Sequence, residues 1–208
     1  MSSKAYEDEG TPEEVSRRTF MTNAVIAMGG VIAISLAIPL GVSMIPAAGT
    51  LDAAWSPLSA AERDALMKAT EVPTKVTFML HSQDGYYAPK DVEHFVWAIK
   101  ADDATMRKHR PGLYEGSEKM PFPIVNLGFV VFSSICPHLG CLYAWDTPKQ
   151  LFVCPCHGSK YTQFGEHVAG PAQRGLDPLP LRDHDGTVQV TWIQYKGNEN
   201  SHLILSYG

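Results

Sequence analysis

The four cysteines of this chain are confined to two short segments, and this clustering constrains the fold more than any other feature of the sequence. Box 1 is residues 136–141, CPHLGC, and box 2 is residues 154–159, CPCHGS. Each box supplies one histidine and two cysteines. Two cysteines and two histidines form a common metal ligand set, so we expect the two boxes to meet in space. The remaining pair of cysteines is free to form a disulfide.

Two kinds of metal centre match this ligand set. One is a tetrahedral zinc ion, and the other is a 2Fe-2S cluster in which two histidines replace two cysteines on one iron. Zinc sites usually group their ligands by type, as Cys-x-x-Cys and His-x-x-x-His. Here each box mixes the types, as Cys136-x-His138 and Cys154-x-x-His157, so each loop can give one ligand to each iron. The spacing therefore favours the cluster over zinc.

The two boxes carry a specific resemblance. CPHLGC and CPCHGSKY resemble the cluster-binding boxes of the Rieske iron–sulfur proteins, in the high-potential branch found in cytochrome bc and bf complexes. The matching segment covers roughly residues 133–172, and outside it the chain matches the family in layout only. The resemblance implies a single 2Fe-2S cluster. In it, Cys136 and Cys154 would bind one iron, and His138 and His157 would bind the other.

The second cysteine pair, Cys141 and Cys156, stands at matching places in the two boxes and could join the two ligand loops. In the family these positions form a disulfide, so the resemblance implies that pairing here. Soluble Rieske ferredoxins and ring-hydroxylating oxygenases typically lack this pair. Its presence therefore favours the high-potential class.

The resemblance also assigns roles in tuning the cluster to six further residues: Ser159, Tyr161, Leu139, Gly140, Gly158 and Pro171. Ser159 would donate a hydrogen bond to a bridging sulfide and Tyr161 one to a ligating thiolate. Such donors stabilise the reduced, more negative cluster and raise its potential. Leu139 would cover the cluster, and the two glycines would let backbone amides approach the sulfurs. Pro171 would belong to a third loop, residues 170–172, that closes over the cluster.

The two histidines predict that electron transfer is coupled to a proton. With two thiolates and two neutral imidazoles, the oxidised centre has a net charge of about zero, and reduction makes it more negative. Reduction also makes the outer N–H of an iron-bound imidazole less acidic. A quinol donor needs this coupling, because it gives up protons together with electrons. We therefore expect both His138 and His157 to face solvent or quinol, and one of the two to hydrogen-bond the quinol and accept its proton.

The N-terminal region contains a long segment without charge. No charged residue lies between Arg18 and Asp52, and residues 20–45 are mostly apolar. A membrane-spanning helix needs about 20 such residues, so the sequence predicts one over residues 19–45. A secretory signal has a shorter apolar core, about 7–15 residues, although small residues at positions 47–49 leave cleavage open. An uncleaved anchor is favoured over a cleaved signal and over a buried core helix.

Residues 1–18 are predicted to be a cytoplasmic tail that ends in the arginine pair Arg17-Arg18. Arginines beside a span keep that end of the chain in the cytoplasm. The pair also resembles a twin-arginine export signal, which would carry a folded, cluster-loaded protein outward. A cluster assembled in a reducing compartment and a disulfide formed outside it are consistent with such export. The acidic tail is unlike a mitochondrial transit peptide. We therefore expect a bacterial cytoplasmic membrane, with the Rieske domain on its extracytoplasmic side.

The remainder of the chain is predicted to form a mainly β structure, a Rieske-type antiparallel domain over residues 73–208 with a small cluster-binding subdomain at about 133–172. Residues 46–72 are expected to be a hinge or linker with a short helix, which opens with the capping box Ser59 to Glu62. The net charge of -5 provides no basic patch and so excludes nucleic acid as a partner.

Alternating apolar residues and turn residues predict six strands: 74–80, 95–100, 123–133 (as one or two strands), 180–182, 187–195 and 202–206. Asp185-Gly186 marks a hairpin between the fourth and fifth of these. Residues 101–120 match no pattern, and we expect a surface insertion with a short helix. The histidines outside the boxes lack partner spacing and are expected at the surface: His81, His94, His109, His167, His184 and His202.

Taken with the resemblance, these features imply the electron-transfer subunit of a quinol:cytochrome c oxidoreductase, within a dimeric, membrane-bound, multi-subunit complex. The Rieske domain would swing on residues 46–55, take an electron from quinol at a cytochrome b subunit, and pass it to a c-type or f-type cytochrome or a plastocyanin-type acceptor. Three alternatives remain: the small Rieske subunit of an arsenite oxidase-like molybdoenzyme, a soluble Rieske ferredoxin, and a structural zinc module.

Overall fold

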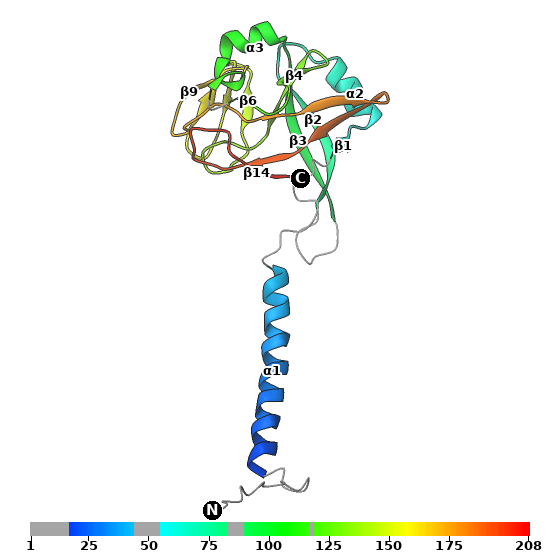
Figure 1. Ribbon diagram of the computed structural model, residues 1–208. Coiled ribbons are helices and arrows are strands. Elements are labelled where there is room, and N and C mark those ends of the chain that lie inside the picture. Colours follow the sequence, from blue (N-terminus) through cyan, green and yellow to red (C-terminus); the bar gives the residue numbers. More distant parts are fainter. Residues whose placement is uncertain (1–16, 44–54, 83–89, 117–118) are drawn as a thin grey trace, which may run out of the picture. The chain divides into compact units, whose positions relative to one another are not determined.

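The computed structural model of the chain describes four segments: residues 17–43, 55–82, 90–116 and 119–208 (Figure 1). They belong to two compact units, Met1–Ala48 and Gly49–Gly208. Residues 1–16 of the predicted tail and residues 46–54 of the predicted hinge or linker lie outside the described residues.

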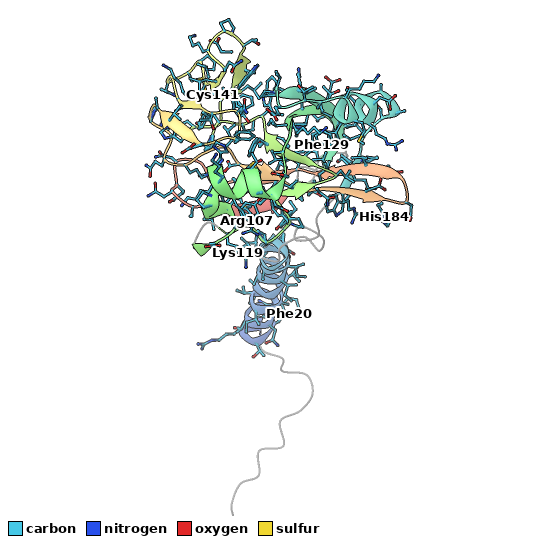
Figure 2. The ribbon with its side chains drawn as sticks, turned by 90° about the horizontal axis from the view of Figure 1, so that it is seen from above. Phe20, Arg107, Lys119, Phe129, Cys141 and His184 are labelled. Atoms are coloured by element: carbon cyan, nitrogen blue, oxygen red, sulfur yellow. A yellow bond between two sulfur atoms is a disulfide. The ribbon has the colours of Figure 1, made fainter. Side chains whose placement is uncertain are left out.

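The described part of the first unit is one helix, α1 (Arg17–Ser43), of 27 residues. At 1.5 Å per residue it is about 40 Å long, against about 30 Å for the hydrocarbon core of a bilayer. The most apolar 18-residue window within Arg17–Gly41 has a mean hydropathy of 2.2. Large apolar side chains project from the helix, among them Phe20, which is 65% exposed (Figure 2). The helix is therefore long and apolar enough to cross a membrane, and it begins two residues before the predicted span.

The central sheet of the second unit is antiparallel, and its strands are β2 (Thr74–Ser82), β3 (Lys90–Lys100), β4 (Val125–Asn126), β5 (Phe129–Ser133) and β10 (Pro178–Leu179). Their order is β10-β5-β3-β2, with β4 also paired to β5. All of β5 is buried, because Val130 and Phe132 pack into one apolar core while Phe129 and Val131 pack into a second. Burial on both faces explains why this strand is apolar at nearly every position.

Three smaller antiparallel sheets complete the unit, built from β1 (Trp55–Pro57), β6 (Ala144–Asp146), β7 (Leu151–Val153), β8 (Lys160–Tyr161), β9 (His167–Ala169), β11 (Leu181–His184), β12 (Thr187–Thr191), β13 (Ile193–Tyr195) and β14 (Ile204–Tyr207). Their orders are β1-β12-β11, β13-β14 and β6-β7-β8-β9. The prediction of a mainly antiparallel β fold is confirmed. Box 1 precedes β6, and box 2 connects β7 to β8, so both boxes are loops of the four-stranded sheet.

Helix α2 (Ala60–Met67) begins where the capping signal predicts. The Ser59 hydroxyl accepts a hydrogen bond from the backbone N–H of Glu62 at 3.2 Å. The Glu62 carboxylate does not complete the box. It accepts instead from the backbone N–H of Thr77 at 3.0 Å and thereby ties α2 to strand β2.

The expected surface insertion, residues 101–120, is packed more deeply than the sequence predicts. It contains helix α3 (Asp103–His109) and the 3-10 helix η1 (Pro111–Leu113). Met106 and Leu113 are 0% and 1% exposed and belong to the core that surrounds the cysteine boxes. The expected short helix is confirmed, but the expectation of a surface insertion was wrong, because Met106 and Leu113 are buried by contacts with distant parts of the core that the local sequence does not reveal.

The predicted strand over residues 187–195 is two strands that serve different sheets. The chain leaves β12 at Trp192, and β13 pairs with β14 rather than with β11. The hairpin turn at Asp185-Gly186 is confirmed, with both residues at positive φ. Apolar alternation continues through Trp192, so the sequence pattern alone does not reveal the change of partner.

A buried polar network joins Arg110, Arg174, Asp177 and His202. Arg174 donates from Nε and Nη2 to both carboxylate oxygens of Asp177, at 2.7 and 2.8 Å. Arg110 Nη1 donates to the carbonyl oxygen of Gly165 at 2.6 Å. The His202 Nε2 atom lies 3.5 Å from Arg110 Nη2 and 3.8 Å from Asp177 Oδ1. His202 is only 9% exposed, so its predicted surface position was wrong.

The environment of His202 predicts a specific dependence of stability on pH. Burial, followed by the charges of Arg110 and Arg174, lowers the pKa of His202 to about 3, from 6.5. Between these values the unfolded chain binds the additional proton, so the free energy of unfolding rises with pH. Above pH 6.5, His202 is neutral in both the folded and the unfolded chain and does not reduce the free energy of unfolding. As the pH falls from 6.5 toward 3, protonation of His202 in the unfolded chain progressively lowers that free energy. We expect His202→Gln to remove this part of the loss, measured by urea unfolding in detergent at pH 7, 5 and 4.

Asp177 also has a shifted pKa, which burial raises and Arg174 lowers in part. Because Asp177 is present in both proteins, the difference between wild type and His202→Gln at each pH reports the contribution of His202 alone. The control is His184→Gln, because His184 is exposed on β11. An identical pH dependence of unfolding in wild type and His202→Gln would contradict the prediction.

Candidate metal centre

Box 1 is a tight loop closed by its own backbone. Gly140 N–H donates to the carbonyl oxygen of Cys136 at 3.1 Å, and Cys136 N–H donates to the carbonyl oxygen of Cys141 at 2.7 Å. Gly140 has a φ of 80°, a conformation that glycine adopts without steric cost. The glycine of the box therefore reverses the chain directly after His138 and Leu139.

Box 2 repeats this geometry. Gly158 N–H donates to the carbonyl oxygen of Cys154 at 3.0 Å, and Cys154 N–H donates to the carbonyl oxygen of Ser159 at 2.9 Å. Gly158 has a φ of 76°. Two similar loops thus present one cysteine at the start of each turn and one histidine near its apex.

The four expected ligands are brought together by the two loops. Cys136 and Cys154 are free thiols, 1% and 2% exposed. The ring centroids of His138 and His157 lie 4.8 Å apart, with the rings nearly perpendicular at 88°. His138 is half-buried and His157 is exposed. The site therefore has its thiols on the inside and its imidazoles toward the outside.

Two observations show that these residues fit a metal group. The Nδ1 atom of His138 is buried and has no hydrogen-bond partner, which is costly unless the nitrogen binds something. Burial raises the pKa of the Cys136 thiol, against hydrogen bonds from the Tyr161 hydroxyl and the His138 backbone that lower it, and nearby Cys154 raises it further. Two adjacent buried thiols and an unpaired imidazole nitrogen are donors of the kind that bind a cationic iron centre.

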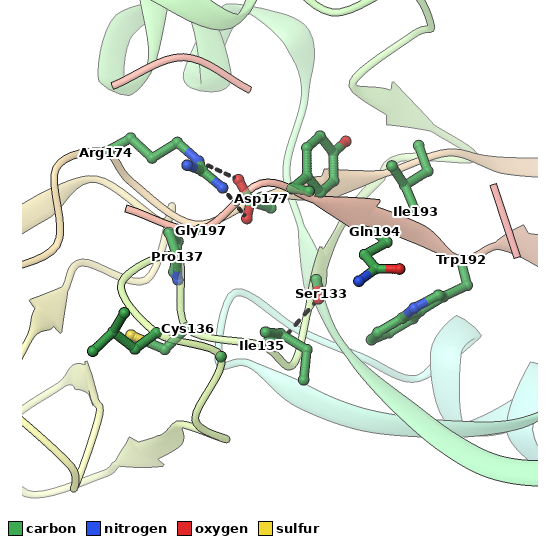
Figure 3. A pocket seen from close by; sticks show the side chains of 13 residues that line it. Ser133, Ile135, Cys136, Pro137, Arg174, Asp177, Trp192, Ile193, Gln194 and Gly197 are labelled. Atoms are coloured by element: carbon green, nitrogen blue, oxygen red, sulfur yellow. Dashed lines mark hydrogen bonds and ion pairs between the residues drawn. The ribbon is translucent and has the colours of Figure 1, made fainter. Parts of the chain in front are cut away.

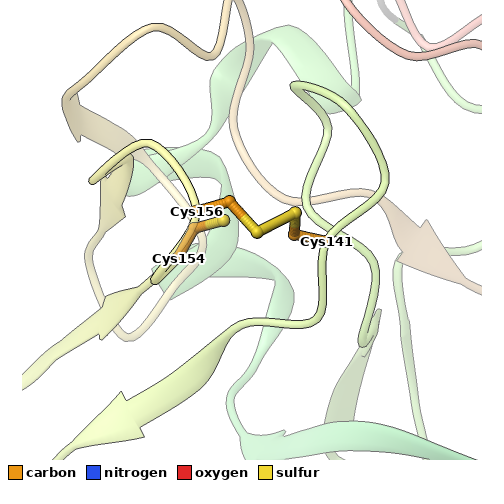
Figure 4. A group of neighbouring side chains, drawn as sticks. All are labelled: Cys141, Cys154 and Cys156. Atoms are coloured by element: carbon orange, nitrogen blue, oxygen red, sulfur yellow. A yellow bond between two sulfur atoms is a disulfide. The ribbon is translucent and has the colours of Figure 1, made fainter.

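The boxes are joined covalently by a disulfide between Cys141 and Cys156, the pairing that the resemblance implies (Figure 4). The two cysteines are 15 positions apart in the sequence. The sulfur of Cys154 lies with both of theirs in a group whose members are all within 4.8 Å of one another. The disulfide therefore lies directly beside one expected ligand and holds the two loops at that point.

The residues expected to tune the centre occupy distinct positions. The Tyr161 hydroxyl lies 3.2 Å from Cys136 Sγ, and both residues are buried. The Ser159 hydroxyl accepts from the backbone N–H of Ala172 at 3.1 Å, which leaves its own proton available for donation. Leu139 is 63% exposed at the tip of box 1, so its covering role stays a prediction.

The third loop, residues 170–172, packs directly on box 2. Gly170 has a φ of 96°, and a Cβ atom at this position would fall onto the backbone of Ser159. Ala172 is 4% exposed, whereas Pro171 lies at the surface. Glycine is therefore needed at position 170 both for its backbone conformation and for the close approach of two chain segments.

Sequence reasoning missed two supports of the site. One is the buried ion pair Arg174–Asp177, for which the spacing of opposite charges three positions apart was an available signal. The other is a turn at Gly197-Asn198, where the Asn198 N–H donates to the carbonyl oxygen of Pro137 at 2.8 Å. A Gly-Asn dipeptide signals a turn, but nothing in the local sequence indicates that the turn contacts box 1.

Gly170→Ala tests the close approach of the third loop to box 2. We expect it to lower the free energy of unfolding by about 1–2 kcal/mol for the backbone conformation, plus about 1–3 kcal/mol for the overlap with Ser159. The matched control is Gly186→Ala, which has a φ of 79° but open space around it and so loses only the first part. Urea unfolding measures both. Equal losses of unfolding free energy in the two variants would show that the close approach of position 170 to Ser159 does not affect stability.

Comparison with known proteins adds a family match. A model described as the Rieske [2Fe-2S] domain matches residues 104–180, a range that includes both boxes and the third loop. The cytochrome b6-f complex iron-sulfur subunit of Chlorobaculum tepidum is 43% identical over 70 residues, which is 33% of this chain and 39% of that protein. The chloroplastic subunit of the same name from Fritillaria agrestis is 31% identical over 156 residues, 65% of this chain and 67% of that protein.

Among solved structures, the soluble domain of the Rieske protein II from Sulfolobus acidocaldarius is 17% identical. The match covers 75% of this chain and 87% of that one, with a TM-score of 0.42. The chain spans 39% of the length of the Chlorobaculum tepidum subunit and 38% of the length of the chloroplastic subunit of the same name from Bigelowiella natans, less than two fifths of either.

Proposed function

The chain belongs to the Rieske iron–sulfur protein family, and from that premise we propose that it is the electron-transfer subunit of a membrane complex that oxidises quinol. One observation carries the proposal: two buried free thiols and two outward imidazoles meet on paired loops that a disulfide joins. A bound 2Fe-2S cluster, the cofactor of the family, supplies one-electron redox chemistry at this position. The relatives named above are subunits of cytochrome b6-f complexes, which supports the same class of complex here.

In this proposal Cys136 and Cys154 bind one iron, and His138 and His157 bind the other. A single zinc ion would hold all four donor atoms at 2.0–2.3 Å, and hence within about 4 Å of one another. Among the described residues, the group of metal-binding side chains whose atoms all lie within 4.8 Å of one another is Cys141, Cys154 and Cys156, which contains neither histidine. Its two disulfide sulfurs are not thiolates. The spread of the four ligands favours two irons over one zinc.

The outward histidines would form the contact with quinol. His157 is exposed and His138 half-buried, so each ring can present to a partner the nitrogen that does not bind iron. That nitrogen would accept a hydrogen bond or a proton from the quinol hydroxyl. The two thiols, by contrast, are shielded from water, and Cys136 also contacts the hydroxyl of Tyr161.

Helix α1 would anchor the protein by a single pass, with its N-terminus in the cytoplasm and the Rieske domain on the extracytoplasmic side of a bacterial membrane. The length and apolar surface of the helix support the anchor, and Arg17 and Arg18 at its start support the orientation. The partners would be a cytochrome b subunit and a c-type or f-type cytochrome, in a dimeric complex. The alternative, a small subunit of an arsenite oxidase-like molybdoenzyme, is not favoured by the relatives.

Electron paramagnetic resonance (EPR) of the dithionite-reduced, detergent-solubilised full chain tests the proposal, with redox titrations at several pH values. We expect the signal of one reduced 2Fe-2S cluster and a midpoint potential within about −150 to +300 mV, the range of histidine-ligated clusters. We also expect the potential to fall as the pH rises through the alkaline range. Copurification with a cytochrome b would support the complex. A colourless, EPR-silent, zinc-containing protein would contradict the function, and a pH-independent potential would contradict only the proton coupling.

Tyr161→Phe tests the hydroxyl that lies beside Cys136. Because a donor to the thiolate stabilises the more negative reduced state, we expect the midpoint potential to fall by about 30–60 mV, a three- to tenfold change in the one-electron equilibrium. Tyr143→Phe is the matched control, since it also removes a buried hydroxyl, but one that donates to the carbonyl oxygen of Ser133 rather than to a thiol. Equal potentials in wild type and Tyr161→Phe would contradict the assignment.

A further inference from the structure

We propose that residues 196–199, which follow β13, form a fourth loop of the cluster site, with Gly197 and Asn198 as positioning residues for His138. This inference rests on the proposed function, because it concerns how one expected iron ligand is held. Figure 3 shows Gly197 beside Pro137, with Cys136 close by. None of the three family loops described above includes these residues.

The need for such a loop follows from a cavity behind box 1. The cavity has a volume of about 410 Å³, and its lining includes Cys136 and Pro137 on one side and Ile193 and Tyr195 of β13 on the other. Because side chains do not fill this space, packing against β13 does not determine where box 1 lies. A direct contact between box 1 and the segment that follows β13 therefore helps to fix the position of box 1.

The fourth loop makes that contact through two successive backbone carbonyls. Asn198 N–H donates to the carbonyl oxygen of Pro137 at 2.8 Å. A Cβ atom at Gly197 would lie 3.0 Å from the carbonyl oxygen of His138. These two carbonyls flank the Cα of His138, so the loop contacts the backbone on both sides of this one residue. No positive φ requires glycine at position 197, but a Cβ atom there would press on the carbonyl oxygen of His138, and one of the two backbones would have to shift by a few tenths of an ångström.

The fourth loop is itself held firmly by the segment that follows the third loop. Gln173 Nε2 donates to the side-chain oxygen of Asn198 at 3.3 Å, and Arg174 Nη1 donates to the carbonyl oxygen of Glu199 at 2.8 Å. The guanidinium of Arg174 is held in turn by its buried ion pair with Asp177. A buried, paired arginine is a rigid support, because releasing it would leave a charge unpaired inside the protein.

Box 1 is thus tied down at two ends. At one end the disulfide joins Cys141 to box 2, and at the other the fourth loop holds Pro137 and His138. If the second tie is loosened, box 1 can pivot about the disulfide. Such a movement changes the direction of the His138 ring and lengthens the 3.2 Å contact between Cys136 Sγ and the Tyr161 hydroxyl, which lowers the potential.

Gly197→Ala and Gly197→Val in the full-length, cluster-loaded chain test the proposal by redox titration and EPR. For alanine we expect the equilibrium constant for one-electron reduction to fall at least threefold, which lowers the midpoint potential by about 28 mV at 59 mV per tenfold change. For valine we expect a larger decrease. The g-values should shift as well, because they report the geometry at the histidine-bound iron. Gln173→Ala, which releases the loop without adding bulk, should lower the potential in the same direction. Asn200→Ala, at an exposed position just after the loop, is the control and should leave both quantities unchanged.

A second readout does not need the cluster. In the apo chain we expect Gly197→Val to accelerate amide hydrogen exchange at Asn198, Cys136 and Gly140, while exchange at the distant β2–β3 pair stays as in wild type. Variants that melt at a lower temperature but keep the wild-type potential and g-values would overturn the inference, since the loop would then be merely structural. A wild type without the cluster signal would overturn the proposed function, whereas a normal wild type with unshifted Gly197 variants would overturn only this inference.

Discussion

The site depends first on the disulfide between Cys141 and Cys156, which ties together two loops on either side of the β6–β7 hairpin. Closing a loop of this length stabilises a folded chain by about 3 kcal/mol in the chain-entropy description. The disulfide also has a local effect, because its sulfurs adjoin Cys154. With both boxes joined there, two buried free thiols lie next to one another at the edge of the apolar core that contains Phe152 and Tyr161.

The remaining constraints come from hydrogen bonds that link the loops to the β structure. Ser133, at the end of β5, donates its N–H to the carbonyl oxygen of Asp177, whose carboxylate is paired with Arg174. Box 2 is joined to the third loop through Ser159 and Ala172. Buried polar groups must be paired, so this network has few alternative arrangements. It transmits the rigidity of the central sheet to loops that have little packing of their own.

Local signals predicted the elements that depend on local interactions. Ser59 begins α2 as its capping pattern indicates, and Asp185-Gly186 forms the hairpin turn. The failures share one cause, which is that burial depends on distant residues. Met106 is buried although its segment has no periodic pattern, and His202 is buried beside two arginines that lie far away in the sequence. At Trp192 the chain changes sheets without any interruption of apolar alternation.

The sequence by itself determined which candidate groups the chain offers: two cysteines and two histidines as the expected ligands, their mixed spacing in two boxes, the second cysteine pair, and an apolar segment long enough to span a membrane. These are properties of short segments, and they do not depend on where the segments lie in the fold. Only the tertiary structure decided what surrounds that chemistry. The hydroxyl of Tyr161 meets Cys136, Gly170 meets Ser159, and the backbone N–H of Asn198 meets the carbonyl oxygen of Pro137. Such contacts join residues that are far apart in the sequence, so they exist only once the strands have paired and brought the loops together.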